Sequence, residues 1–177
     1  KGRHGIVHCQ ITNPRILQGM KDQELLAYIQ PVFIDLDMNT VEPAIGAQRM
    51  DKVYAWKSML DMGIHTSGGS DAPVVSFDAM ENIYFAVTRK NISGQPQEGW
   101  IPSEKISVDE AVKLFTKNAA YASYTEDENG TIEVGKNADF VVLEKNIYEI
   151  DPDEIKATKV DMTVLGGEIV YEREVEE

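Results

Sequence analysis

Residues 64–73 read Ile64-His65-Thr66-Ser67-Gly68-Gly69-Ser70-Asp71-Ala72-Pro73. The β-capable run 64–67 follows a turn at Met62-Gly63 and leads into two glycines, an acid and a proline, so the backbone leaves a strand and turns sharply. We therefore place Asp71 at the carboxyl end of a strand, where the loops of an α/β protein form a ligand crevice. Two roles fit Asp71: a chemically active carboxylate, or an Asx-turn aspartate that caps the next segment.

The segments before residue 75 alternate between strand and helix patterns. Residues 5–11 read as a strand, and Asn13-Pro14 opens a helix over 15–22, because an Asn N-cap followed by proline is a helix-start pattern. The apolar run 25–34 is typical of a strand buried on both faces, and a loop over 35–40 follows it. Helical spacing over 48–61 then precedes the strand at 64–67. This order implies parallel strands joined by crossover helices, in a barrel or a doubly wound sheet.

The pattern changes after residue 75. An amphipathic helix is predicted over 76–91, and a long loop with aromatic content covers 93–102. The capping box from Ser107 to Glu110 opens a helix that we expect to end near residue 123. Four short β-like runs follow, and Gly166-Gly167 joins the last two as a hairpin; they lie at 131–134, 140–143, 162–165 and 168–171. We expect a small antiparallel β unit and divide the chain into residues 1–124 and 125–177.

Composition limits the classes of partner and compartment. The 17 basic and 30 acidic residues give a net charge of −13, which argues against binding to nucleic acid or an anionic membrane surface. The single cysteine, Cys9, cannot form an internal disulfide and is expected to be a buried small apolar residue. No apolar stretch approaches the roughly 18 residues that span a bilayer, and the N-terminus lacks the apolar core of a signal peptide. We therefore expect a cytoplasmic protein whose partners are small molecules or proteins.

Histidine and aspartate suggest part of a metal site. His8 lies near the end of the first strand and Asp71 near the end of the third, so parallel strands bring both residues to the same end of the sheet. Imidazole and carboxylate are standard zinc ligands, although a catalytic zinc takes three protein ligands and keeps an open position. His8 is therefore either a ligand or a hydrogen-bonded core histidine. His65 is expected to be structural and His4 exposed, and a serine hydrolase is disfavoured because no GxSxG elbow is present.

Seven short motifs occur in order along the chain: Ile6-Val7-His8-Cys9-Gln10, Gln30-Pro31, Tyr54-Ala55-Trp56, Gly69-Ser70-Asp71-Ala72-Pro73-Val74, Ala86-Val87-Thr88-Arg89, Asn118-Ala119-Ala120-Tyr121-Ala122 and Gly135-Lys136-Asn137-Ala138-Asp139. The set covers nearly the whole chain. It resembles the C-terminal part of a metal-dependent amidohydrolase, of the branch called amidohydrolase family 3.

This resemblance implies an α/β fold, with the last strands and helices of a TIM-type (β/α) barrel in 1–124. Residues 125–177 would form a small antiparallel β unit, half of a composite β-sandwich. It also implies a divalent metal, with zinc expected, and hydrolysis of an amide or cyclic amide C–N bond in a small-molecule substrate by a metal-bound water. His8 would be a metal ligand, and Asp71 a ligand and the proton-transfer base.

Two further residues are candidates for contacting the substrate. Arg49 would bind substrate anions, or is simply a solvated helix arginine. Trp100 would form a wall of the substrate pocket, or packs under the long loop that contains it.

The chain also departs from the family pattern. It has no HxH pair and no middle-strand histidine or lysine, and a complete barrel takes about 250 residues. We therefore expect a fragment that holds the last three barrel strands, whose open edges favour homo-oligomers. The alternative function is a non-catalytic fragment or degenerate relative that associates with itself or with a partner protein.

Overall fold

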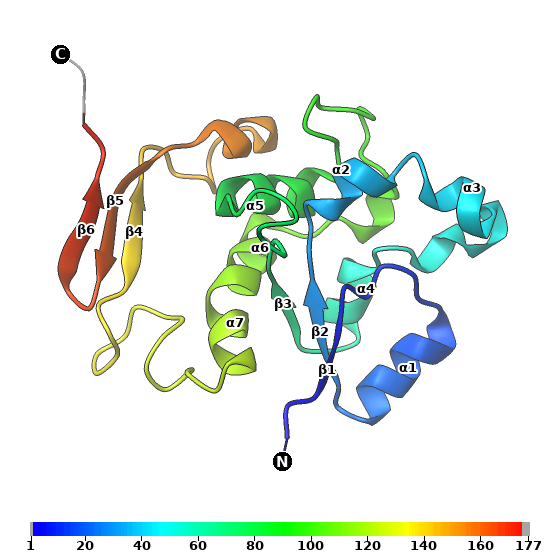
Figure 1. The fold of residues 1–177 in the computed structure, drawn as a ribbon, viewed down its shortest axis with the longest axis horizontal. Helices are drawn as coiled ribbons and strands as arrows, with labels where there is room; N and C mark the ends of the chain where they lie inside the picture. Colours follow the sequence, from blue (N-terminus) through cyan, green and yellow to red (C-terminus); the bar gives the residue numbers. More distant parts are fainter. Residues whose placement is uncertain (1, 175–177) are drawn as a thin grey trace.

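The computed structural model describes residues 2–174, which fold into helices and two separate three-stranded sheets (Figure 1). The strands are β1 (Gly5–Val7), β2 (Leu26–Ile29), β3 (Thr66–Gly68), β4 (Phe140–Leu143), β5 (Val160–Leu165) and β6 (Glu168–Glu172). The α-helices are α1 (Pro14–Asp22), α2 (Phe33–Asp37), α3 (Val41–Ile45), α4 (Trp56–Asp61), α5 (Ala79–Thr88), α6 (Val108–Phe115) and α7 (Lys117–Ala122). Three 3-10 helices complete the structure: η1 (Ala47–Lys52), η2 (Pro102–Glu104) and η3 (Pro152–Ala157).

The first sheet is parallel, with the strand order β1-β2-β3. Ile6 lies opposite Ala27, and Tyr28 lies opposite Ser67, so the three strands run in the same direction in register. Helix α1 connects β1 to β2, and α2 to α4 connect β2 to β3. The predicted alternation of parallel strands with connecting helices is therefore confirmed, and the carboxyl ends of all three strands lie at one edge of the sheet.

The central strand β2 lies in the hydrophobic core. Leu26, Ala27 and Ile29 are buried, as expected of a parallel strand with neighbours and covered faces. The strand is shorter than the apolar run 25–34, because the backbone turns after Gln30 and enters α2, where the N–H of Phe33 donates to the Gln30 carbonyl over 3.1 Å. The prediction of a loop over 35–40 is therefore wrong in its first half, which belongs to α2.

Two other predicted helices are interrupted. The segment 48–61 consists of η1 and α4, separated by extended Val53 and by Tyr54, which has a φ of +50°. The predicted helix 107–123 is split at Thr116 into α6 and α7. Its start is confirmed, because the Glu110 N–H donates to the Ser107 hydroxyl, while the Glu110 carboxylate accepts from the Ser107 N–H over 2.8 Å.

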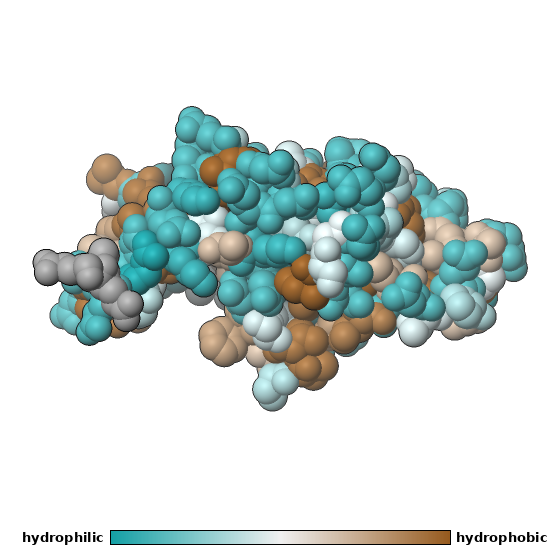
Figure 2. All heavy atoms as spheres, turned by 90° about the horizontal axis from the view of Figure 1, so that it is seen from above, coloured by the Kyte–Doolittle hydropathy of each residue, from teal (hydrophilic) through white to brown (hydrophobic). Residues whose placement is uncertain are grey.

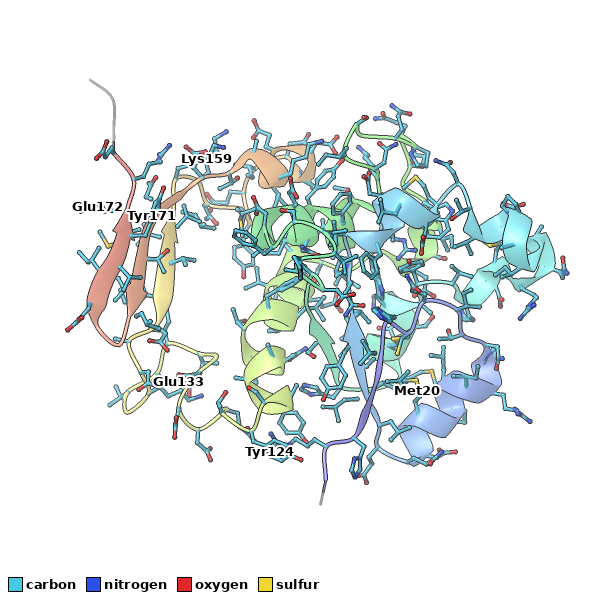
Figure 3. All side chains as sticks on the ribbon, in the orientation of Figure 1. Met20, Tyr124, Glu133, Lys159, Tyr171 and Glu172 are labelled. Carbon is cyan, nitrogen blue, oxygen red and sulfur yellow. The ribbon has the colours of Figure 1, made fainter. Side chains whose placement is uncertain are left out.

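The second sheet is antiparallel, with the order β4-β5-β6, and it lies beyond α5, α6 and α7 from the parallel sheet (Figure 1). The hairpin at Gly166-Gly167 is confirmed, with Leu165 opposite Glu168. The β-like run at 131–134 forms no strand: Ile132 is 85% exposed. Tyr171 and Glu172, adjacent in β6, are both exposed (Figure 3). Because successive residues of a strand point to opposite faces, both faces of β6 have exposed side chains.

The surface of the molecule is mainly hydrophilic in the view of Figure 2, with hydrophobic residues exposed in separate patches. Across residues 2–174, no helix is both long and apolar enough to cross a membrane.

Candidate functional site

Three polar side chains follow the carboxyl ends of the parallel strands. His8 comes directly after β1, Gln30 directly after β2, and Asp71 three residues after β3. Gln30 follows the central strand and so lies between the strand that His8 follows and the strand that precedes Asp71. The parallel arrangement thus brings His8 and Asp71 to one edge of the sheet, as the sequence predicts.

The His8 imidazole is held on two sides. Its Nδ1 lies 2.9 Å from Oε1 of Gln30, and its ring packs at 5.7 Å between centroids against Phe33 of α2. The backbone N–H of His8 donates to the Tyr28 carbonyl over 2.8 Å, which continues the β1–β2 ladder beyond the last residue of β1. No residue between 2 and 174 makes a hydrogen bond to Nε2, so that nitrogen is available to a ligand.

Asp71 is exposed at the same edge. The N–H of Gly69 donates to the Ile29 carbonyl over 2.9 Å and extends the sheet pairing past β3, and the Val74 N–H then donates to the Asp71 carbonyl over 2.9 Å to form a turn. The Asp71 carboxylate accepts no hydrogen bond from the described part of the chain, so it does not cap the following segment there. It is a free acidic group next to the sheet.

The backbone at both positions is unusual. His8 has a φ of +71° and Asp71 a φ of +62°, in the left-handed region that most residues avoid. Such conformations cost about 1–3 kcal/mol each and occur preferentially at functional sites. Six other non-glycine residues among those described share this region, so the conformation sets how the chain leaves β1 and β3 and does not by itself mark a site.

The described residues do not by themselves complete a metal site. Within residues 2–174, no three His, Cys, Asp or Glu side chains lie close enough together to hold a metal ion. The described chain therefore contributes at most one imidazole nitrogen and one carboxylate here, whereas a catalytic zinc takes three protein ligands.

A partly buried polar cluster lies beside this edge. Gln10 donates through Nε2 to the Asp37 carboxylate over 3.0 Å and to the Tyr54 hydroxyl over 2.6 Å, and that hydroxyl donates to Asp37. Tyr54 is 1% exposed. Burial, followed by the hydrogen bond to Asp37, raises the pKa of the Tyr54 hydroxyl far above its ordinary value, so the hydroxyl stays protonated.

Arg49 and Trp100 have different surroundings. Arg49 is exposed in η1 and borders a hollow of about 180 Å³ whose other lining residues include Thr12 and Asp51. The Trp100 ring packs 5.6 Å from the Tyr54 ring, and the Trp100 carbonyl accepts from Nε of the buried Arg89 over 2.6 Å. Trp100 also borders a hollow of about 300 Å³ together with Met38 and Asn91, so its surroundings are compatible with both roles expected from the sequence.

Arg89, Gln10 and Gln30 were not identified as site residues from the sequence. Arg89 is fully buried and its Nη1 donates to the Tyr54 carbonyl over 2.9 Å, so it ties the loop of Trp100 to Tyr54. All three residues lie inside the short motifs quoted above, and both glutamines come within three residues of a strand end. The position of the two glutamines near strand ends was the one signal in the sequence that could have indicated a role at this edge of the sheet.

Three larger hollows lie elsewhere. One of about 460 Å³ is bordered by α7, residues 129–132 and the start of β4, one of about 440 Å³ is lined by residues that include Met20, His65 and Tyr121, and one of about 390 Å³ with an apolar lining lies between α5, α6 and β4. None of the three is lined by His8 or Asp71. Chemistry, not hollow size, therefore identifies the candidate site.

Nearly the whole chain is similar to known proteins. The model of a family described as the amidohydrolase family matches residues 1–171. A Bacillus subtilis protein named as an amidohydrolase, YtcJ, is 35% identical over 173 residues, which are 97% of this chain and 33% of that protein. An N-substituted formamide deformylase of Arthrobacter pascens is 35% identical over 122 residues, 69% of this chain and 22% of that enzyme.

Among solved structures, a metal-dependent hydrolase of Pyrococcus horikoshii shares the fold, with a TM-score of 0.74 and 21% identity over 83% of this chain and 30% of that one. The chain thus spans a third or less of the length of each of these proteins.

Proposed function

Because the chain belongs to the amidohydrolase family, we propose that it is the C-terminal part of an enzyme that hydrolyses the C–N bond of an amide or cyclic amide in a small-molecule substrate. The observation that carries this proposal is the placement of His8 and Asp71 at one edge of the parallel sheet, each with a side-chain atom free for a ligand. The relative named as an N-substituted formamide deformylase supports amide chemistry by its name.

A divalent metal, with zinc expected, fits the two candidate ligands. Nε2 of His8 and the Asp71 carboxylate would hold it together with ligands from the rest of the protein, since nitrogen and oxygen donors suit zinc. When bound, such a metal lowers the pKa of a water molecule towards about 7 and polarises the scissile carbonyl.

Asp71 would move the proton. Its carboxylate is exposed and has no hydrogen bond from residues 2–174, so one oxygen can accept a proton from the attacking water and later return it to the leaving amine. His8 would not move a proton in this scheme. Its hydrogen bond to Gln30 and its contact with Phe33 hold the imidazole in place as a ligand.

The fold supports the same proposal. We assign β1, β2 and β3 with their helices, residues 1–124, to the last strands of a TIM-type barrel, and residues 125–177 to half of a composite β-sandwich. Support comes from the parallel order of the first sheet and the antiparallel order of the second. We propose Arg49 and Trp100 as substrate contacts only in the complete enzyme.

A second function is favoured by one observation. The small sheet exposes apolar side chains, with Val141 at 53%, Ile169 at 56% and Val170 at 58% exposure. Exposed apolar side chains on a small sheet promote association, so the chain alone would act as a module that binds itself or a partner protein.

The test of the catalytic proposal compares His8→Ala and Asp71→Asn with matched controls in the complete enzyme. The controls are His4→Ala and Asp127→Asn, which alter exposed residues of the same types. We expect Asp71→Asn to lower kcat/KM on N-acyl and cyclic amides by at least about 10²- to 10⁴-fold, the usual contribution of acid–base catalysis, and His8→Ala to lower it through the loss of a metal ligand. Turnover in the site variants equal to that in the controls would contradict the assignment.

Metal content separates the two functions. Metal content is measured by elemental analysis of the purified 177-residue chain and of the complete enzyme. We expect zinc in the complete enzyme, and a lower zinc content in its His8→Ala variant. A complete protein without bound metal and without amide hydrolysis, but with a stable association of the chain, would instead favour the binding module.

A further inference from the structure

Gln30 contacts Nδ1 of His8 and so affects the orientation and protonation of the imidazole, whose other nitrogen, Nε2, has no hydrogen-bond partner among residues 2–174. Gln30 is 7% exposed and lies between His8 and β3 at the carboxyl edge of the sheet. Its Oε1 lies 2.9 Å from His8 Nδ1, and its Nε2 donates to the backbone carbonyl of Tyr28 over 3.4 Å. The amide therefore connects a side chain to the backbone of the central strand.

The orientation of the Gln30 amide follows from its second partner. A backbone carbonyl only accepts hydrogen bonds, so the group facing Tyr28 must be the amide NH₂, and the group facing His8 must then be the amide oxygen. That oxygen cannot donate. The nitrogen opposite it, Nδ1 of His8, must therefore hold the ring proton, and a neutral imidazole with its proton on Nδ1 has its lone pair on Nε2.

We propose that Gln30 is a positioning residue that selects the Nδ1-protonated tautomer of His8 and so directs the lone pair of Nε2 to the carboxyl edge as a metal donor. The contact with Phe33, at 5.7 Å between ring centroids, limits rotation of the same ring. This inference rests on the proposed function for the identity of the ligand, a divalent metal ion. The tautomer itself is a property of the chain without metal.

Hydrogen bonds of this kind matter for metal affinity. The second nitrogen of a ligating histidine usually donates to a neighbouring acceptor, and removal of that acceptor typically lowers metal affinity 10- to 100-fold. Gln30 would supply the acceptor from a neighbouring strand, at a separation of 22 residues in the sequence.

His65 provides an internal reference. Its Nε2 lies 2.9 Å from the Asn118 carbonyl, which only accepts, so His65 must have its proton on Nε2. The structure thus assigns opposite tautomers to two histidines of the same chain.

The test is nitrogen-15 NMR of the histidine rings in the 177-residue chain at about pH 8, above the ordinary imidazole pKa of about 6.5. We expect Nδ1–H at His8 and Nε2–H at His65. Gln30→Leu should give a mixture of tautomers at His8 alone, and Gln30→Glu, which retains an acceptor, should restore the Nδ1–H form. Gln18→Leu, on the exposed face of α1, is the control and should change neither ring.

Zinc ion, added to the metal-free complete enzyme and to its Gln30→Leu variant, distinguishes the two proposals, because residues 2–174 by themselves contribute at most two ligands. If Gln30 positions a ligand, Gln30→Leu raises the Kd for zinc about 10- to 100-fold. Nδ1–H at His8 without any response to zinc would support the role of Gln30 and count against His8 as a ligand. Nε2–H at His8 in the wild-type chain, or a tautomer unchanged by Gln30→Leu, overturns the role of Gln30 whether or not zinc binds.

Discussion

Glu104 stabilises the start of α4 from a distant part of the chain, and its replacement by glutamine tests that role. The carboxylate is 2% exposed. It accepts from the Ser58 N–H over 2.8 Å and from the Ser58 hydroxyl, and Lys52 Nζ lies 3.5 Å from Oε1. Ser58 is the third residue of α4, whose N-cap, Ala55, has no side chain that can accept. Glu104 therefore replaces a missing N-cap.

The expected cost of Glu104→Gln is about 2 kcal/mol. Hydrogen bonds to a charged group contribute about 1.5–3 kcal/mol each and neutral ones about 1 kcal/mol, and glutamine retains the shape and one acceptor. The amide also leaves the Lys52 ammonium without its carboxylate partner. For a domain of this size, 2 kcal/mol corresponds to a Tm lowered by about 4–8 °C.

Urea unfolding followed by circular dichroism measures this free energy of unfolding. Glu98→Gln, at an exposed position in the segment between α5 and η2, is the control and should change stability by less than about 0.5 kcal/mol. A double-mutant cycle with Ser58→Ala should show a coupling energy of about 0.5–3 kcal/mol. Equal stabilities for Glu104→Gln and Glu98→Gln would refute the capping role, and zero coupling to Ser58→Ala would show that the hydroxyl contact adds nothing to the backbone cap.

Two further predictions concern titratable groups. The hydrogen bond from the Arg3 guanidinium holds the pKa of the Glu126 carboxyl at about 2 in the folded chain, below the value of about 4.3 in the unfolded chain. The ionised carboxylate therefore stabilises the folded state fully above about pH 4.3, and this contribution is lost as the pH falls through about 2. The stability advantage of the wild type over Glu126→Gln should therefore shrink in that window in urea titrations, and a constant difference would contradict it. Burial raises the pKa of the Cys9 thiol to about 11, so alkylation of the native chain at pH 8 should be at least about 100-fold slower than in urea; equal rates would show that Cys9 is accessible.

Several elements were predictable because their determinants are local. The capping box at Ser107 needs only residues 107–110, and the hairpin at Gly166-Gly167 needs only two glycines between β-like runs. The apolar run 25–34 was misjudged because a continuous apolar stretch does not distinguish a buried strand from the buried helix that follows it. The turn after Gln30, which separates β2 from α2, became visible only in the structure.

The candidate site likewise has features that are local in the sequence and features that depend on long-range contacts. The position of His8 and Asp71 at one edge of the sheet was predictable because each follows a strand, and parallel strands end at one edge. Their residue types and strand positions are local properties of the chain. The hydrogen bond from His8 to Gln30 spans 22 residues, the cap of α4 by Glu104 spans 46, and Arg89 reaches Tyr54 over 35. No short-range pattern encodes such contacts, because they depend on how separate elements pack together, and only the tertiary structure brings these atoms within hydrogen-bonding distance.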